Sequence, residues 1–221
     1  MLTLTYEYKL DPTTEQASIF DNWLETCRKV YNYALRERKD WVNSRKSAIN
    51  ACSIKQEYIL PADEPRPTYA RQCKALAAAK KVMPNLCIPH THVLQQALRQ
   101  LEAAFVAMWE RGHGISTFQE ADVALFVYPQ LNQNPVRGSM IRLPKIGLVK
   151  MRLSRPIPDG FELKQIRIVK RASGFYAMLC LQSEEIIPEL LPSGHPVGID
   201  LGLSHFLATS DGELVARPRF F

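Results

Sequence analysis

The chain has 221 residues, and 46% of them are hydrophobic, which is enough for one large core or two modest ones and too many for a disordered tail. Lys and Arg outnumber Asp and Glu by 28 to 22, and the five cysteines include no Cys-x-x-Cys pair, so neither a disulfide framework nor a zinc site is predicted. No apolar run could span a bilayer and no leader peptide is recognisable, which predicts a soluble cytoplasmic protein without membrane contact.

The first two elements are predicted from the spacing of their apolar residues, which differs between them. Apolar residues at every second position from Leu2 to Leu10 predict a half-buried strand. Asp11 and Pro12 then predict the start of a helix, with Asp11 as its cap, and apolar residues continue at helical spacing to Leu35. The rest of this helix surface is predicted to be basic, either as a solvated face or as a face that offers cations to phosphate: Arg28, Lys29, Arg36, Arg38 and Lys39.

Two shorter helices are predicted next. Residues 68–82 are Ala-rich and stop before Pro84, and Thr91 can cap a third helix whose apolar stripe ends at Trp109. Because Trp23 and Trp109 both lie on apolar stripes, we expect them in the core rather than on a base-stacking surface. Residues 119–133 have no clear period and are predicted to be an irregular connection.

The chain then changes to strand periodicity. Strands are predicted at residues 140–143, 147–153, 161–170 and 174–182, separated by Pro- and Gly-containing turns. Because a lone first strand needs partners, we expect residues 1–10 to pair with these strands. Residues 1–10 and 134–183 then form one small β-barrel, and residues 11–118 are a helical insertion in it. The acidic, proline-containing residues 184–194 are predicted to be a linker to residues 195–221.

Basic residues gather in two blocks. Residues 134–171 hold ten basic and two acidic side chains, and residues 28–81 hold 13 basic and 5 acidic ones. Such blocks in an otherwise balanced chain favour a polyanion partner, although solvated faces would give the same composition. The predicted phosphate contacts are Arg142, Lys145, Lys150, Arg152, Arg155, Lys164, Arg167, Lys170, Arg28, Lys29 and Arg36.

One motif after the linker carries chemistry. Residues 197–201 are predicted to form a buried strand interrupted by a single charge, Asp200. A carboxylate on an apolar strand is costly unless it is paired or bound to a metal, and Gly198 and Gly202 leave room beside it. An aspartate in this setting suits a magnesium-dependent phosphoryl-transfer site.

The same Gly-Ile-Asp-Leu-Gly motif also resembles the first phosphate-binding hairpin of sugar kinases and actin-like ATPases. In those proteins most of the nucleotide-binding domain follows the hairpin, whereas only a few residues follow Val215 here. No glycine-rich nucleotide loop occurs elsewhere in the sequence. A nucleotide-binding protein is therefore the weaker alternative.

Three blocks together resemble one family. They are LDPTTEQASIFDNWLETCRKVYNYALRER after the first strand, IRLPKIGLVKMRLSRPIPDGFELKQIRIVKRASGFYAMLCLQ in the β region, and GIDLGLSHFLATSDGE near residue 200. In this order they resemble the N-terminal portion of the TnpB/OrfB proteins of insertion sequences, which are RNA-guided DNA endonucleases related to type V CRISPR effectors. Only residues 39–133 match weakly.

The resemblance implies an α+β fold: a small wedge β-barrel with an inserted helical lobe, followed by the first strands of an RNase H-like (RuvC) nuclease domain. It implies guide RNA and target DNA as partners, in the nucleoid of a prokaryotic cytoplasm. Asp200 matches the family's first catalytic carboxylate, which ligates Mg²⁺. The other two carboxylates and the family's zinc finger have no counterpart, so we expect a truncated chain that does not cleave DNA without a C-terminal nuclease portion. The alternative is a non-catalytic nucleic-acid-binding relic or regulator.

Overall fold

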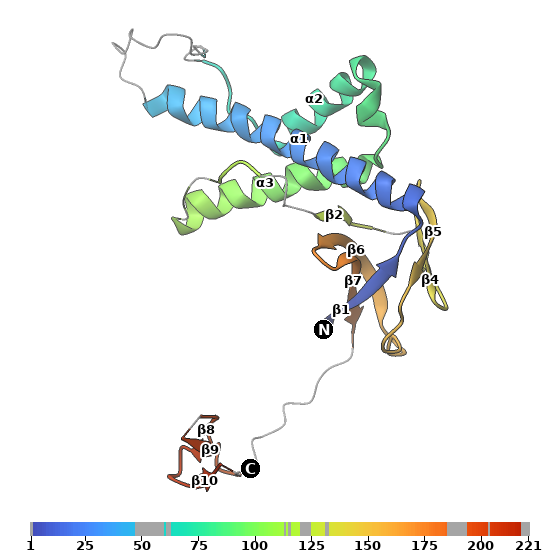
Figure 1. The fold of residues 1–221 in the computed structure, drawn as a ribbon. Helices are drawn as coiled ribbons and strands as arrows, with labels where there is room; N and C mark the ends of the chain where they lie inside the picture. Colours follow the sequence, from blue (N-terminus) through green and yellow to red (C-terminus); the bar gives the residue numbers. More distant parts are fainter. Residues whose placement is uncertain are drawn as a thin grey trace. The chain divides into compact units, whose positions relative to one another are not determined.

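The computed structural model describes residues 2–46, 60, 63–112, 114, 116–119, 125–130, 133–184, 194–202 and 204–217. The chain divides into two compact units, Met1–Glu184 and Glu185–Phe221. Each unit is described by itself (Figure 1). The residues predicted to be the linker, 184–194, lie almost entirely outside the described residues.

The first unit is built on a seven-stranded antiparallel sheet. The strand order is β2-β6-β7-β1-β5-β4-β3, so the first strand of the chain lies at the centre. The bounds are Leu2–Asp11 for β1, Leu125–Tyr128 for β2, Val136–Arg137 for β3, Met140–Leu143 for β4, Gly147–Met151 for β5, Glu162–Arg171 for β6 and Gly174–Ser183 for β7.

Strand β1 pairs with partners that follow it by more than 130 residues. Its register with β7 runs from Leu2 opposite Ser183 to Lys9 opposite Tyr176. At its other end, Leu10 and Asp11 pair with Met151 and Lys150 of β5. This confirms the expectation that the first strand pairs with strands after Met140.

The helices are α1 (Thr14–Lys46), α2 (Tyr69–Val82) and α3 (Thr91–Arg111), with the 3-10 helix η1 (Pro84–Cys87) between α2 and α3. Helices α1 and α3 lie against the sheet and α2 packs on α3, as can be followed in Figure 1. Helix α1 begins with a capping box, because the Gln16 N–H donates to Thr13 Oγ1 and Gln16 Oε1 accepts from the Thr13 N–H. Thr13, and not Asp11 as predicted, is therefore the cap. Asp11 is the last residue of β1 and pairs with Arg152.

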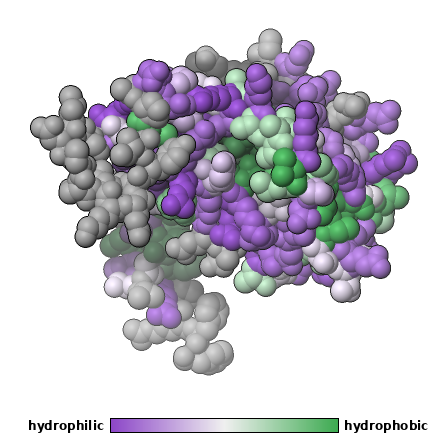
Figure 2. Space-filling model, turned by 90° about the horizontal axis from the view of Figure 1, so that it is seen from above, coloured by the Kyte–Doolittle hydropathy of each residue, from purple (hydrophilic) through white to green (hydrophobic). Residues whose placement is uncertain are grey.

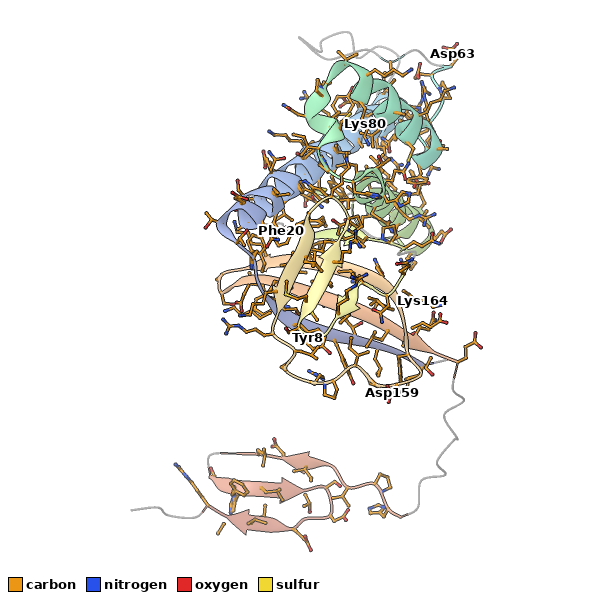
Figure 3. The ribbon with its side chains drawn as sticks, turned by 90° about the vertical axis from the view of Figure 1, so that its right-hand side faces the viewer. Tyr8, Phe20, Asp63, Lys80, Asp159 and Lys164 are labelled. Atoms are coloured by element: carbon orange, nitrogen blue, oxygen red, sulfur yellow. The ribbon has the colours of Figure 1, made fainter. Side chains whose placement is uncertain are left out.

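The core lies between the helices and the sheet. Phe20 and Trp23 of α1 pack on Phe126 of β2, with ring centroids 5.9 and 5.5 Å apart. Figure 3 shows Phe20 where the helix meets the strands, and Tyr8 lies further along the sheet. Buried residues alternate along β7, because successive side chains of a strand point to opposite faces.

The sheet is open, which corrects the predicted barrel. Among the described strands no ladder joins β2 to β3, the two edges. Helix α3 packs on β2, and β3 has only two residues, so neither edge offers a long ladder. The Tyr128 hydroxyl, at the end of β2, instead donates to the Pro144 carbonyl in the β4–β5 turn over 3.0 Å.

Two further expectations are corrected. Strand β2 lies inside residues 119–133, which were predicted to be irregular, and it extends the sheet by pairing with β6. Trp109 was expected in the core but is 43% exposed. It lies in the last turn of α3, where the Arg66 guanidinium is 3.4 Å from its ring centroid. Trp23 is buried as expected.

The second unit is a three-stranded antiparallel sheet in the order β10-β9-β8. Its strands are β8 (Ile199–Asp200), β9 (His205–Thr209) and β10 (Leu214–Ala216). Its apolar side chains lie largely in solvent: Ile199 is 65% and Leu201 68% exposed. The strand predicted around Asp200 is therefore present, but within this unit it is not buried.

Candidate nucleic-acid interface

A polar groove of about 550 Å³ opens beside the start of α3. His90 and His92 line it from the helix, and Gln130, Gln133 and Asn134 line it from the segment that joins β2 to β3. Arg137 of β3 and Arg142 of β4 complete it. None of its described lining residues carries a carboxylate, so the groove offers amides, imidazoles and guanidinium groups only.

The two histidines are held by the N-terminus of α3. His90 is the cap of the helix, and its Nδ1 accepts from the His92 N–H over 3.3 Å. The rings meet edge to face, with their centroids 5.0 Å apart. Because the free N–H groups of a helix N-terminus carry partial positive charge, this end of the groove favours anions and acceptor atoms.

His90 is neutral at physiological pH. Desolvation lowers its pKa, and the nearby His92, Lys145 and Lys80 lower it further. Since Nδ1 accepts a hydrogen bond, the proton of the neutral ring is assigned to Nε2. His90 therefore offers a hydrogen-bond donor rather than a charge.

The guanidinium groups of Arg137 and Arg142 supply the positive charge of the groove. Both side chains are exposed, and neither has a carboxylate partner among the described residues. Strand pairing fixes their positions, because Arg137 lies opposite Met140 and Arg142 lies opposite Leu148. The groove thus combines two free cations with amides, the side chains that recognise phosphates and base edges.

Lys145, a predicted phosphate contact, has a different role. Its ammonium group donates to the carbonyl oxygens of Cys87, Ile88 and Pro89 at 2.7, 3.3 and 3.4 Å. It lies in the β4–β5 turn with φ 65°. Lys145 therefore joins the sheet to the connection between η1 and α3.

Other predicted phosphate contacts already face carboxylates. Arg28 and Lys29 both bind Glu25, whose pKa the Arg28 hydrogen bond lowers to about 2. Arg152 binds Asp11 at 2.8 Å, Lys164 binds Glu162, and Lys170 binds Asp21 at 2.7 Å. These pairs reduce the positive charge that those side chains can offer to a polyanion.

The remaining candidates are distributed over the first unit. The Arg155 guanidinium lies 4.5 Å from the Tyr6 ring centroid. Three further side chains are exposed and make no hydrogen bond or ion pair among the described residues: Lys150 of β5, Arg36 of α1 and Arg167 of β6. Of the eleven predicted contacts, only Arg142 lines the groove.

Sequence analysis did not identify the other groove residues. His90 and His92 bracket the start of α3, and their alternation around Thr91 was the available signal. Gln133, Asn134 and Arg137 lie in and beside a segment without periodicity, where no pattern assigns a direction to a side chain. The view onto the helices in Figure 2 shows a mainly hydrophilic surface with small, separate hydrophobic areas.

Asp200 lies in the second unit, exposed, on β8 opposite Ala208. No group of three or more His, Cys, Asp or Glu side chains that could hold a metal ion occurs among the described residues. Their arrangement therefore does not fit a magnesium site. The same part of the chain contains no helix long and apolar enough to cross a membrane.

Comparison with known proteins gives consistent matches. The OrfB_IS605 family model, described as a helix-turn-helix domain, matches residues 1–47; the described part of that range forms β1 and the single helix α1. A candidate RNA-guided DNA endonuclease of Streptomyces pristinaespiralis is 25% identical over 221 residues, covering 97% of this chain and 50% of the relative. The candidate RNA-guided DNA endonuclease InsQ of Escherichia coli (strain K12) is 25% identical over 210 residues, covering 94% of this chain and 47% of its own.

The family model and these relatives make the chain similar to OrfB_IS605 proteins and to RNA-guided DNA endonucleases. The resemblance to the TnpB/OrfB family that the sequence motifs indicated is thereby confirmed. The chain spans about half the length of the curated relatives it matches.

Proposed function

We propose that this chain is the nucleic-acid-binding part of a transposon-encoded RNA-guided DNA endonuclease, and that its groove binds double-stranded DNA. The observation that carries the proposal is the composition of the groove, where Arg137 and Arg142 lie among amides and imidazoles without a lining carboxylate. The matched relatives support it, because their names combine an RNA guide with a DNA substrate.

The chemistry of the groove suits the edges of base pairs. Arginine recognises guanine, and asparagine or glutamine recognises adenine, through paired hydrogen bonds in the major groove. Gln133, Asn134 and Arg142 offer these groups together. A neutral His90 adds a donor, while the N-terminus of α3 favours a phosphate next to the bases.

Residues 195–217 enter the proposal as the first strands of an RNase H-like nuclease domain, with Asp200 as its first carboxylate. The family resemblance of the Gly-Ile-Asp-Leu-Gly motif supports this assignment. Since a metal site needs several ligands, cleavage would require carboxylates in addition to Asp200. We therefore assign binding, and not cleavage, to the chain by itself.

The proposal is tested by removing the two free cations of the groove. Arg137→Gln combined with Arg142→Gln is expected to weaken binding of a labelled DNA duplex. It should also flatten the dependence of log K on log salt by about 2 units, because each lost phosphate contact releases about one counterion fewer. Fluorescence anisotropy across a salt series measures both quantities.

The matched control combines Arg28→Gln with Lys164→Gln. It removes the same net charge from side chains that already face Glu25 and Glu162. We expect the control to leave the slope nearly unchanged. An equal loss in both double variants would show that only net charge matters, and would refute the groove as the binding site.

A further inference from the structure

A second surface lies on the opposite face of the same sheet. Phe175, Ala177 and Leu179 of β7 are buried in the core. Because side chains alternate along a strand, Tyr176 and Met178 lie on the other face, where both are half-exposed. The aromatic ring of Tyr176 thus lies on a central strand but outside the core.

Strand pairing surrounds this ring with basic side chains. Lys9 of β1 lies directly opposite Tyr176, and the guanidinium of Arg171 lies 5.6 Å from the ring centroid. The backbone N–H of Arg152 donates to the Lys9 carbonyl over 2.8 Å, which places the start of the β5–β6 connection beside this ring. On the other side, the Tyr176 hydroxyl shares a hydrogen bond of 2.8 Å with Ser173 Oγ, which fixes the ring.

The charge of this face is positive. Glu7 binds Arg171 at 2.5 Å and Asp11 binds Arg152 at 2.8 Å, which offsets two of the cations. Lys9 remains, and Arg167 of β6 lies on the same face opposite Met178, exposed and without a carboxylate partner among the described residues. The ring is therefore flanked by free positive charge along two strands.

This arrangement suits single-stranded rather than double-stranded nucleic acid. A base stacks on an aromatic side chain only if one of its faces is free, and within a duplex stacking on the neighbouring base pairs covers both faces. Cations beside the ring can then bind the phosphates on either side of the stacked base.

We propose that the open face of β1, β7 and β6 binds a single-stranded stretch of nucleic acid, with one base stacked on Tyr176 and its phosphates beside Lys9 and Arg167. The inference rests on the proposed function, because it assigns a second, separate contact to the same nucleic-acid-binding chain. An unpaired part of a guide RNA and a displaced DNA strand share this chemistry.

The test compares Tyr176→Leu with Tyr176→Phe in the full chain. Single-stranded RNA of about 12 nucleotides, within the size range of such sites, and DNA of the same sequence serve as probes. Each probe carries 2-aminopurine, whose fluorescence falls on stacking. We expect Tyr176→Leu to weaken binding by at least about fivefold and to abolish the quenching, while Tyr176→Phe keeps both because it keeps the ring. The probe whose binding Tyr176→Leu weakens more, RNA or DNA, identifies the nucleic acid that the site binds.

A charge variant gives an independent reading. Arg167→Gln is expected to flatten the salt dependence of single-strand binding by about 1 unit, whereas Lys164→Gln, on the same strand but bound to Glu162, should not. If Tyr176→Leu binds both probes as tightly as the unchanged chain, or if Tyr176→Phe loses as much as Tyr176→Leu, the stacking site is refuted.

Binding of duplex DNA separates the two proposals. The Tyr176 variants are expected to bind a duplex normally, because the groove lies on other elements. Normal duplex binding with unaltered single-strand binding in Tyr176→Leu overturns only the stacking site. An equal loss of duplex binding in the groove variant and in its matched control overturns the proposed function instead, and a chain that binds neither ligand overturns both.

Discussion

Single residues of the same type do different work in this protein. Lys145 adopts a left-handed backbone conformation that few non-glycine residues take, and its ammonium group binds three carbonyl oxygens at the end of η1. Those carbonyls follow a helix terminus, where intrahelical partners run out. The side chain of Lys150, five residues later, is exposed and makes no hydrogen bond among the described residues.

This difference gives a stability test. Lys145→Met keeps most of the side-chain volume and removes the hydrogen bonds to the carbonyls of Cys87 and its neighbours. We expect the free energy of unfolding to fall by about 1 kcal/mol, since an exposed charged hydrogen bond contributes near the lower end of its range. Urea denaturation monitored by circular dichroism measures the change. Lys150→Met is the matched control and should change it by less than about 0.5 kcal/mol; equal losses would contradict the structural role of Lys145.

Packing between helices depends on one buried charge. Arg38 of α1 is 2% exposed, and its NH2 lies 2.5 Å from Glu102 Oε2 of α3. Its Nε donates to Gln72 Oε1 of α2 over 2.9 Å, and Gln72 in turn donates to the Ala34 carbonyl of α1. Arg38 therefore joins all three helices, and removing it takes the facing cation from the carboxylate of Glu102 and the donor from Gln72 Oε1.

We expect Arg38→Ala to lower the free energy of unfolding by about 3–5 kcal/mol, because breaking a buried ion pair leaves the other charge uncompensated. Arg36→Ala, two residues earlier on the exposed side of α1, is the control and should cost less than about 0.5 kcal/mol. Chemical denaturation of both variants provides the comparison. Similar losses would mean that Arg38 contributes helix propensity and surface charge rather than a buried contact.

Elements in which apolar residues repeat at a regular spacing over many positions were predictable from the sequence. Short elements, and contacts that several helices share, were not. The alternation from Leu2 to Leu10 and the apolar stripe of α3 were predicted because one face of each packs on the core for most of its length. Strand β2 has four residues, too few to establish a period. Arg38 was predicted on the surface because arginine is rarely buried, and only the positions of Gln72 and Glu102 on other helices make its burial tolerable.

The candidate site was harder to predict for the same reason. The basic blocks indicated a region but not the residues that line the groove. The sequence alone does not distinguish a Lys or Arg that binds Glu25 or Asp11 from one that has no carboxylate partner. The groove instead combines the cap of α3 with residues around β3, which the chain separates by more than 40 positions. Only the tertiary contacts place them together.

Over the whole molecule, the two units differ in how much apolar surface they bury. The first has a continuous core from the sheet to the helices. In the second, Leu214 is 61% exposed, as are most of the apolar side chains of its strands. A three-stranded sheet without a covered face is marginally stable by itself, so this unit depends on whatever polypeptide covers it.

We expect this difference to appear in amide hydrogen exchange. Amides of β8, β9 and β10 should exchange with a protection free energy well below that of β6 and β7, because local opening there breaks few buried contacts. Mass spectrometry of peptides from residues 194–217 and 162–183, in the same sample, makes the comparison internal. Equal protection of the two peptides would show that the second unit is covered in solution and would contradict the expectation.

The central place of β1 also affects how the protein is made. Leu2 leaves the ribosome well before its partner Ser183, which is synthesised 181 positions later. At about 5–20 residues per second, the N-terminal strand waits roughly 10–40 s for its partner. The helices can form during that interval, while β1 remains an unpaired, half-apolar strand edge of the kind that favours aggregation. Slow translation and early chaperone contact with the first ten residues should therefore influence the yield of this protein more than its final stability does.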